Sequence, residues 1–465
     1  MTMTTDAAAA QGEAAGKPVW SSQLGFILAA AGSAVGLGNI WKFPYMTGEN
    51  GGGAFVLVYL GCIALVGIPA LMTEMLVGRR GGHSPIQSVR DVVAEARAPR
   101  AWGWIGIIST LAAFLTLAFY SVVAGWAMPF VGHSIAGFDA SDPEAVQALF
   151  PNLLAAPDQL LMWHTVFMVM TIFISARGIN RGIEAAVKVM MPTLVLILML
   201  LIGYSAVMNM DSLRQAVVFL FRPNFGALTT ESTLSALGHA FFTLSLASGS
   251  MLAYGSYLSK STPIVRTAVT VAAVDTAVAL MAGLAIFPLV FQYGMEPAAG
   301  PGLVFATLPL AFAQMPGGDI LGPVFFILLV IAAWTSSLSM IESVVEWLQE
   351  KGIGRTASAI LAGGAAWALG ILCLLSLNVM SGFAPLSFIP ALEDKGMMDA
   401  LDYIVTNVLM PLGALALAIF VGYIMPKDAL RDELSTSARA FGIVRGMIRT
   451  ITPIGILVIF LTNLI

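Results

Sequence analysis

Charged residues are scarce in this chain. Asp, Glu, Lys and Arg make up 10% of its 465 residues, whereas 58% are hydrophobic and the mean hydropathy is +0.88. Because soluble globular domains carry about 25% charged residues, the composition excludes a soluble enzyme. The formal net charge of −4 provides no basic surface for a polyanion, and we expect no nucleic-acid partner.

Cysteine and histidine are also rare. Cys62 and Cys373 both lie in apolar runs, which is typical of small buried hydrophobes rather than of a disulfide or metal pair. The four histidines lack the spacing of metal ligands. The first residues have neither the basic start nor the apolar core of a signal peptide, so we interpret residues 1–16 as a disordered cytoplasmic tail.

Long apolar runs, in contrast, fill most of the sequence. A helix that crosses a membrane needs about 20 mostly apolar residues, and 161–176, which is short, either begins earlier or lies between other helices. The candidate segments are 22–47, 54–78, 102–130, 161–176, 185–208, 233–258, 264–293, 320–349, 356–378, 400–425 and 442–464. The sequence therefore predicts an all-α polytopic membrane protein with eleven transmembrane helices.

Lysine and arginine are unevenly distributed between these segments. If the N-terminus is inside, 18 of the 22 fall in the inner connections and 4 in the outer ones. Because positive residues concentrate on the cytoplasmic side, we expect a multi-pass protein of the plasma (inner) membrane with a cytoplasmic N-terminus.

Small and polar residues interrupt the first and sixth segments. Residues 31–39 read AGSAVGLGN and residues 241–250 read FFTLSLASGS. A small-residue face for helix packing explains either stretch alone, but glycine weakens a helix by about 1 kcal/mol and unpaired backbone is costly in lipid. Two breaks five segments apart favour inverted five-helix repeats, helices 1–5 and 6–10, with discontinuous helices 1 and 6 and an additional helix 11.

This pattern divides the chain into consecutive parts. They are a tail (1–16), a first five-helix repeat (17–208), an outer loop (209–232), a second five-helix repeat (233–425), and an inner loop with helix 11 (426–465).

Polar groups inside the apolar segments mark candidate sites. The hydroxyls of Thr335 and Ser336, with the carbonyls one turn before them, form a hard-oxygen set suited to sodium, although a packing face explains them equally well. Asp275 lies deepest in its segment and requires a cation, a partner or a proton.

Together these residues resemble the neurotransmitter:sodium symporter family, in its bacterial, leucine-transporter-like branch of neutral amino-acid carriers. The resemblance extends from about Trp20 through the tenth segment. It is carried by GLGN at 36–39, KFP at 42–44, ENGGGAF at 49–55, Tyr120, AFFTLS at 240–245 and TSS at 335–337.

The resemblance implies a sodium-coupled symporter that imports neutral L-amino acids by alternating access, with no catalytic residues. The implied substrate-binding residues are Ala34, Leu37, Gly38, Thr116, Tyr120, Val123, Phe242, Thr243, Ser245, Ser248, Ser337 and Met340. It also implies two sodium sites. The first would use Ala34, Asn39, Thr243 and Asp275, and the second Gly32, Val35, Ala332, Thr335 and Ser336.

Two positions narrow the implied substrate. Gly36 stands where monoamine carriers of the family have an aspartate, so the substrate must bring its own carboxylate. Ser248 stands where leucine-preferring relatives have a phenylalanine, which enlarges the pocket for large aliphatic or aromatic side chains. The fixed carboxylate of Asp275 implies that chloride is not required.

The resemblance also implies moving parts. The outer gate would pair Lys42 with Asp402, and the inner gate would pair Lys17 with Glu350. The residues implied near the inner end are Trp20, Tyr257, Glu74 as an acceptor for the broken backbone of helix 6, and the hinge residues Gly182 and Pro192. An ordinary proline kink is the alternative for this hinge.

Other functions remain open on the sequence. Coupling by protons or by exchange would use the same fold, and so would a sensor that does not transport. An intramembrane enzyme would depend on Ser248 with His239, which lacks a third orienting group. The preferred amino acid, the ion stoichiometry and the oligomeric state are not predicted.

Overall fold

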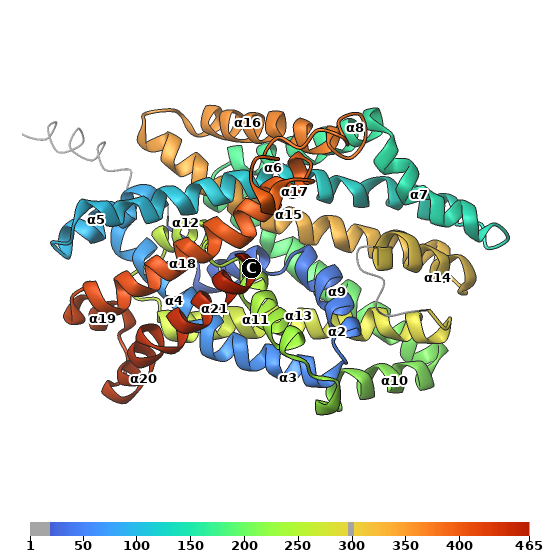
Figure 1. The fold of residues 1–465 in the computed structure, drawn as a ribbon, viewed down its shortest axis with the longest axis horizontal. Coiled ribbons are helices and arrows are strands. Elements are labelled where there is room, and N and C mark those ends of the chain that lie inside the picture. Colours follow the sequence, from blue (N-terminus) through green and yellow to red (C-terminus); the bar gives the residue numbers. More distant parts are fainter. Residues whose placement is uncertain (1–18, 296–301, 465) are drawn as a thin grey trace, which may run out of the picture.

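The computed structural model describes residues 19–295 and 302–464, in which every regular element is a helix (Figure 1). Within this part, nine helices are long and apolar enough to cross a membrane. They are Gly53–Gly81, Arg100–Ala136, Pro157–Ala176, Ile179–Met208, Ile264–Gln292, Gly318–Glu350, Arg355–Leu375, Met397–Ile424 and Ala438–Thr462. The predicted segment 161–176 therefore begins earlier, at Pro157.

The long spans contain several labelled helices joined by short π-helical segments. These helices are α3 (Gly53–Cys62), α4 (Ile68–Gly81), α6 (Trp104–Ala136), α8 (Pro157–Ala176), α9 (Ala185–Met208), α13 (Ile264–Gln292), α15 (Gly318–Glu350), α16 (Arg355–Leu375), α17 (Met397–Tyr403), α18 (Met410–Ile419) and α21 (Ile451–Leu464). The π segments include Ile179–Glu184 before α9 and Ile404–Leu409 between α17 and α18.

The first predicted segment is a broken helix. Its halves, α1 (Gln23–Ala34) and the stretch Gly38–Glu49 that ends in α2 (Phe43–Glu49), meet at 54°. Helix α1 ends because Val35 adopts an extended conformation, with its N–H still bonded to the Ala31 carbonyl at 2.6 Å. The break falls within the predicted glycine-rich stretch.

The sixth predicted segment is also broken, into α11 (Thr230–Thr243) and α12 (Ser250–Ser256). Between them Ser245, Ala247 and Gly249 take positive φ angles of 51°, 58° and 73°. The Ala247 N–H donates to Glu74 Oε1 at 2.6 Å, which confirms the expected role of this buried carboxyl group. Neither half is long enough to cross a membrane alone. In the described residues, the number of spans that pass by length is therefore nine, or ten with the bent first helix, and not the predicted eleven.

The two breaks lie against each other. The Ser245 hydroxyl donates to the Ser33 carbonyl at 2.9 Å, which joins the break of helix 6 to that of helix 1. The long helices α6 and α15 pack along each other beside this point. Discontinuous helices five apart, in an all-helical bundle, are the arrangement of two five-helix repeats.

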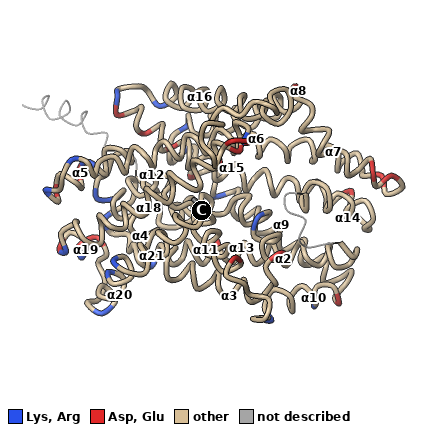
Figure 2. Tube along the Cα trace, viewed as in Figure 1, with Lys and Arg blue, Asp and Glu red and all other residues tan. Residues whose placement is uncertain are grey.

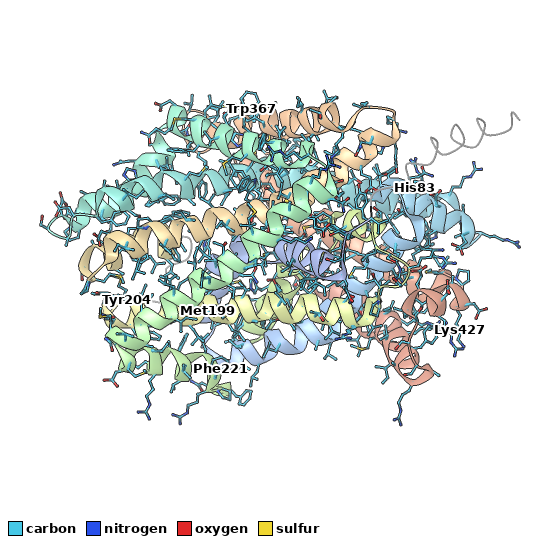
Figure 3. The ribbon with its side chains drawn as sticks, turned by 180° about the vertical axis from the view of Figure 1, so that it is seen from behind. His83, Met199, Tyr204, Phe221, Trp367 and Lys427 are labelled. Carbon is cyan, nitrogen blue, oxygen red and sulfur yellow. The ribbon has the colours of Figure 1, made fainter. Side chains whose placement is uncertain are left out.

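Charged residues gather toward the two ends of the bundle, and its middle contains few of them (Figure 2). One end carries α5 (Pro85–Glu95), α19 (Lys427–Leu434) and α20 (Ala438–Arg449), and we call it the basic end. The opposite end carries α7 (Pro143–Ala155), α10 (Met210–Phe221) and α14 (Leu308–Gln314). Apolar side chains such as Met199 of α9 project outward between the ends (Figure 3), as expected for a surface that faces lipid.

Candidate functional site

A buried carboxylate lies between the two broken helices. Asp275 of α13 accepts a hydrogen bond from the Asn39 amide at 2.7 Å and from the Thr243 hydroxyl at 3.1 Å. All three side chains are at most 2% exposed. The structure therefore brings together Asn39, Thr243 and Asp275 of the first implied sodium set, and Ala34 lines the adjacent cavity.

Carbonyl oxygens converge on α15 at the second implied sodium set. The Ser336 hydroxyl lies 3.2 to 3.4 Å from four carbonyls, those of Gly32, Ser33, Val35 and Ala332. A hydroxyl has one proton to donate, so most of these oxygens remain without a donor from Ser336. The Thr335 hydroxyl lies nearby, 3.0 Å from the Ala332 carbonyl.

This arrangement is one that a small hard cation satisfies. Carbonyl and hydroxyl oxygens suit sodium-like ions rather than soft metals. Residues 19–295 and 302–464 contain no group of three or more His, Cys, Asp or Glu side chains that could hold a metal ion.

A small central cavity of about 40 Å³ lies between the two sets of oxygens. It has room for only a few water molecules. Its lining contains the implied substrate residues Ala34, Leu37, Gly38, Thr116, Tyr120, Phe242, Thr243, Ser245, Ser248 and Met340. At one wall the Leu37 N–H donates to the Tyr120 hydroxyl at 3.3 Å.

Two implied substrate residues do not line this cavity. Ser337 turns toward α8, where its hydroxyl lies 3.1 Å from that of Thr171, and the half-buried Val123 lies further along α6. The cavity is instead also lined by Phe119 from α6, and by Val405, Thr406 and Met410 from the span Met397–Ile424. The three residues of this span were not predicted, although Thr406 and Asn407 interrupt the apolar segment 400–425 and could have marked it.

A second cavity, of about 560 Å³, opens toward the end opposite the basic end. Phe242, Thr406 and Met410 line both this cavity and the central one, so they form the partition between them. The predicted ion pair of Lys42 with Asp402 is not formed between these two described residues. The Lys42 ammonium lies 4.5 Å from the centre of the Phe242 ring, where a cation–π contact stabilises it.

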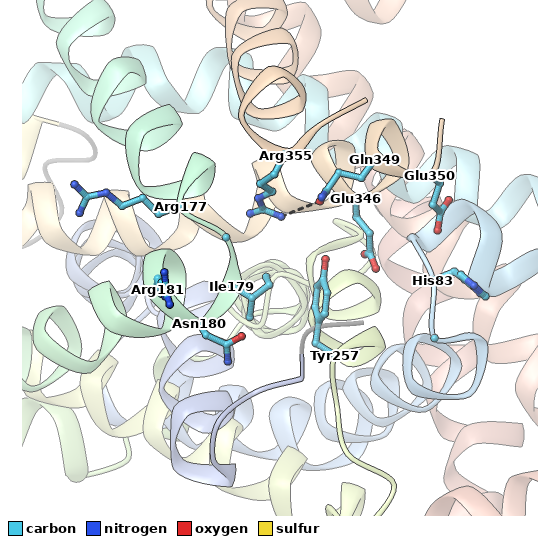
Figure 4. Close-up of a pocket in the computed structure, with 12 residues that line it drawn as sticks. His83, Arg177, Ile179, Asn180, Arg181, Tyr257, Glu346, Gln349, Glu350 and Arg355 are labelled. Carbon is cyan, nitrogen blue, oxygen red and sulfur yellow. Dashed lines mark hydrogen bonds between the residues drawn. The ribbon is translucent and has the colours of Figure 1, made fainter. Parts of the chain in front are cut away.

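A third cavity, of about 660 Å³, lies at the basic end (Figure 4). Tyr257 lines it and donates its hydroxyl to Glu342 at 2.8 Å. Arg355 forms an ion pair with the same carboxylate at 2.5 Å and also donates to Gln349. The pair of Glu342 and Arg355 was not predicted, because in the sequence the two residues occur only as charges near the ends of neighbouring spans.

Of the implied inner-gate residues, Tyr257 and Glu350 line this cavity. Lys17 lies outside the described residues, and Glu350 accepts hydrogen bonds from the N–H and the hydroxyl of Ser84, both at 2.6 Å. Trp20 is buried beneath α12, where its indole donates to the Tyr254 carbonyl at 3.1 Å and its N–H to the Tyr257 carbonyl at 3.3 Å.

The implied hinge lies in the span Ile179–Met208, at the start of α9. Gly182 is in the π segment Ile179–Glu184, and Pro192 lies within the continuous helix α9. A Cβ atom on Gly182 would lie 2.2 Å from the Ile174 carbonyl of α8, so this close approach requires glycine. Glu184, which was not predicted, anchors the beginning of helix 1 by accepting a hydrogen bond from the Ser21 N–H at 3.0 Å.

The serine and histidine of the enzyme alternative do not pair. The Ser248 hydroxyl donates to the Ser245 carbonyl at 2.7 Å. Both ring nitrogens of His239 are buried without a hydrogen-bond partner in the described part of the chain, and its ring packs on Phe43 and Tyr59. Ser248 therefore has no base to activate it as a nucleophile.

Comparisons with known proteins identify the family. The chain matches the family model described as the sodium:neurotransmitter symporter family over residues 17–139 and 155–465. The chain belongs to this family. It is a multi-pass membrane transporter of the sodium-dependent kind and not an enzyme.

Its relatives include uncharacterized proteins and one solved structure. The sodium-dependent transporter YhdH of Bacillus subtilis (strain 168) is 40% identical over 97% of this chain and 98% of its own length. A sodium-dependent transporter of Haemophilus influenzae is 33% identical over 96% and 98%. The crystal structure of MhsT in complex with L-phenylalanine matches with a TM-score of 0.85 and 39% identity, over 96% of this chain and 100% of that one.

Proposed function

We propose that this family member is a symporter that uses a sodium gradient to import neutral L-amino acids with large aliphatic or aromatic side chains. The observation that carries the proposal is the pair of facing helix breaks, with the buried Asp275 carboxylate on one side of the central cavity and converging carbonyls on the other. Broken membrane helices with unpaired backbone persist only where they line a cavity or bind a ligand.

The first sodium ion would bind at Asp275, Asn39, Thr243 and the Ala34 carbonyl, with the substrate carboxylate as a further ligand. The Leu37 N–H and the Tyr120 hydroxyl meet at the cavity wall, where the positive end of a half-helix favours a carboxylate. Because ion and substrate would share ligands, each raises the affinity of the other. This reciprocity is the proposed basis of coupling.

The second sodium ion would bind where four carbonyls surround the Ser336 hydroxyl, together with Thr335. Those carbonyls belong to both α1 and α15. An ion between them would hold α1 against α15 with the basic end closed, and its loss would free α1 to move.

The side-chain pocket supports an apolar substrate. The Thr116 hydroxyl donates to its own helix at the Ala112 carbonyl, at 2.7 Å, and the Ser248 hydroxyl is bonded to the Ser245 carbonyl. These polar residues therefore offer their carbon atoms to the cavity, beside Met340, Val405 and Met410. MhsT, the structural relative, was solved with L-phenylalanine, which supports acceptance of an aromatic side chain.

Alternating access would use the cavities on both sides of the central one. We propose that the basic end faces the cytoplasm, as the distribution of Lys and Arg predicts. The partition of Phe242, Thr406 and Met410 closes the outer side, with Lys42 holding the Phe242 ring. Trp20, Tyr257, Glu342 and Arg355 close the inner side. Gly182 and Pro192 would allow the start of helix 5 to unwind.

The test is uptake of labelled neutral amino acids into proteoliposomes. We expect accumulation with an inward sodium gradient and none with potassium, and unlabelled phenylalanine, leucine and isoleucine should compete better than glycine. Sodium-independent uptake would indicate proton coupling or exchange instead. Saturable binding without uphill uptake would indicate a sensor.

Chloride replacement gives a separate prediction. Asp275 supplies a fixed negative charge beside the first sodium set, so a mobile anion is not needed for charge balance there. We expect sodium-driven uptake to be unchanged when gluconate replaces chloride on both sides of the membrane. Uptake that disappears in gluconate and returns with added chloride would contradict the assigned role of this carboxylate.

A further inference from the structure

Arg79 is a buried arginine at the basic end, in the last turn of α4. Its side chain is 3% exposed, and its guanidinium makes three hydrogen bonds. It donates to the Glu433 carboxylate at 2.7 Å, to the Glu433 carbonyl at 2.5 Å and to the Thr262 carbonyl at 2.6 Å. One side chain thus connects α4 both to α19 and to the loop between α12 and α13.

Arg80 adds a second layer to this connection. It donates to the other oxygen of Glu433 at 3.1 Å and forms an ion pair with Glu95 of α5. The hydrogen bond from Arg80 lowers the pKa of the Glu95 carboxyl group. Glu433, which is 6% exposed, is therefore held by two guanidinium groups. We call Arg79, Arg80, Glu433 and the Thr262 carbonyl the Glu433 clamp.

The clamp holds the loop that follows α12, the helix at the closed basic end. Thr262 follows Tyr257 by five residues, and the Tyr257 and Tyr254 carbonyls are the acceptors for Trp20 at the beginning of helix 1. Helix α12 has only seven residues and is preceded by the strained break. Helix α12 packs along α4, and the position of its end also depends on what holds the loop at Thr262.

The chemistry of the clamp favours a positioning role over simple stabilisation. A buried ion pair contributes little net stability compared with well-packed apolar residues, but it fixes geometry. A guanidinium can bond two separate segments at once, which an apolar contact does not do with the same directionality. Helix α4 belongs to the first five-helix repeat and α12 to the second, and α19 follows the second repeat.

We propose that Arg79 and Glu433 are positioning residues that restrain α12 and so limit how readily the central cavity opens to the basic end. This inference rests on the proposed alternating-access transport. Weakening the clamp shifts the population toward conformations open at the basic end, and a ligand that favours the closed state then binds less tightly.

The experiment measures accessibility of α12 directly. Ser256 is 7% exposed and donates to Glu346, which lines the basic-end cavity. A cysteine reporter, Ser256→Cys, is placed in a full-length chain without Cys62 and Cys373, and its labelling by a membrane-impermeant maleimide is timed in saturating sodium. We expect Glu433→Gln to raise the labelling rate roughly threefold or more, and to weaken the apparent sodium affinity by a similar factor.

Two further variants keep the result decisive. Asp432→Asn is the matched control, since the Asp432 side chain is 79% exposed and its contact with Arg80 is long, at 3.4 Å, so labelling should remain at the parent rate. Arg79→Lys keeps the charge but loses the forked geometry, so its labelling rate should lie between those of the parent and Glu433→Gln. It provides the test by itself if Glu433→Gln does not fold, with labelling faster than in the parent.

The outcomes separate this inference from the proposed function. Folded Glu433→Gln and Arg79→Lys variants that label at the parent rate, with only a lower melting temperature, would overturn the positioning role. Parent protein that folds but shows no sodium-driven uptake would overturn the proposed function, whatever the labelling rates are.

Discussion

Sodium-driven uptake is expected to be lost when Asp275 is replaced by alanine. The carboxylate is fully buried and accepts hydrogen bonds from Asn39 and Thr243. Its removal leaves the buried Thr243 hydroxyl without this acceptor, at about 1–3 kcal/mol, whereas the Asn39 amide keeps the Asp275 backbone carbonyl at 3.1 Å. The replacement also takes away the charge that attracts the ion. We expect the apparent sodium affinity to fall by about 100-fold.

The measurement is sodium-dependent binding of a labelled amino acid to purified protein, with uptake measured in parallel. Asp275→Asn keeps an acceptor but loses the charge, so it should fall between the parent and Asp275→Ala. Asp211→Ala, an exposed aspartate of α10, is the control that should leave both quantities unchanged. A folded Asp275→Ala protein with the parent sodium affinity would remove this residue from the sodium site.

Both helix breaks could be predicted because their cause is local. Glycines and hydroxyl residues at 31–39 and 241–250 weaken the helix wherever they lie, and a carboxylate such as Asp275 in an apolar run requires a partner. The break at Ser245 and Ala247, and the contacts of Asp275, follow from these residues. The family resemblance then supplied the partners across the bundle.

Other parts of the site have no signal in the sequence. Val405 and Met410 reach the central cavity because the segment Ile404–Leu409 is π-helical, which adds a residue per turn and rotates the helix face. The sequence of this stretch, IVTNVL, does not report that rotation. Side-chain length also leaves choices open: Lys42 can reach more than one partner, and in the structure it packs on Phe242 rather than pairing with Asp402.

The family resemblance also placed Ser337 in the substrate pocket, where the structure does not have it. Ser337 belongs to the same hydroxyl triplet as Thr335 and Ser336, but successive helix residues point in different directions. Two of the three hydroxyls face helix 1, and that of Ser337 faces α8. Of the residues in a helical motif, only those on the same face of the helix can reach one site.

A single methyl group at Gly36 is expected to disable both ligand sites. A Cβ atom there would lie 2.7 Å from the Ser336 hydroxyl oxygen and 3.0 Å from that of Tyr120. Ser336 stands among the four converging carbonyls, and Tyr120 accepts from the Leu37 N–H at the proposed carboxylate position. Since both hydroxyls must move to admit the methyl group, Gly36→Ala changes the second sodium site and the substrate site together.

The expected result is a roughly 10- to 100-fold loss of amino-acid affinity, from an overpacking cost of about 1–3 kcal/mol. Gly61→Ala is the matched control. Gly61 also lies in an apolar helix, α3, and a Cβ atom there meets nothing within 4 Å. Equilibrium binding at several sodium concentrations separates the two effects, because a damaged sodium site is partly rescued by high sodium and a blocked carboxylate site is not. If Gly36→Ala binds as tightly as Gly61→Ala, the ligand does not occupy the space between α1, α6 and α15.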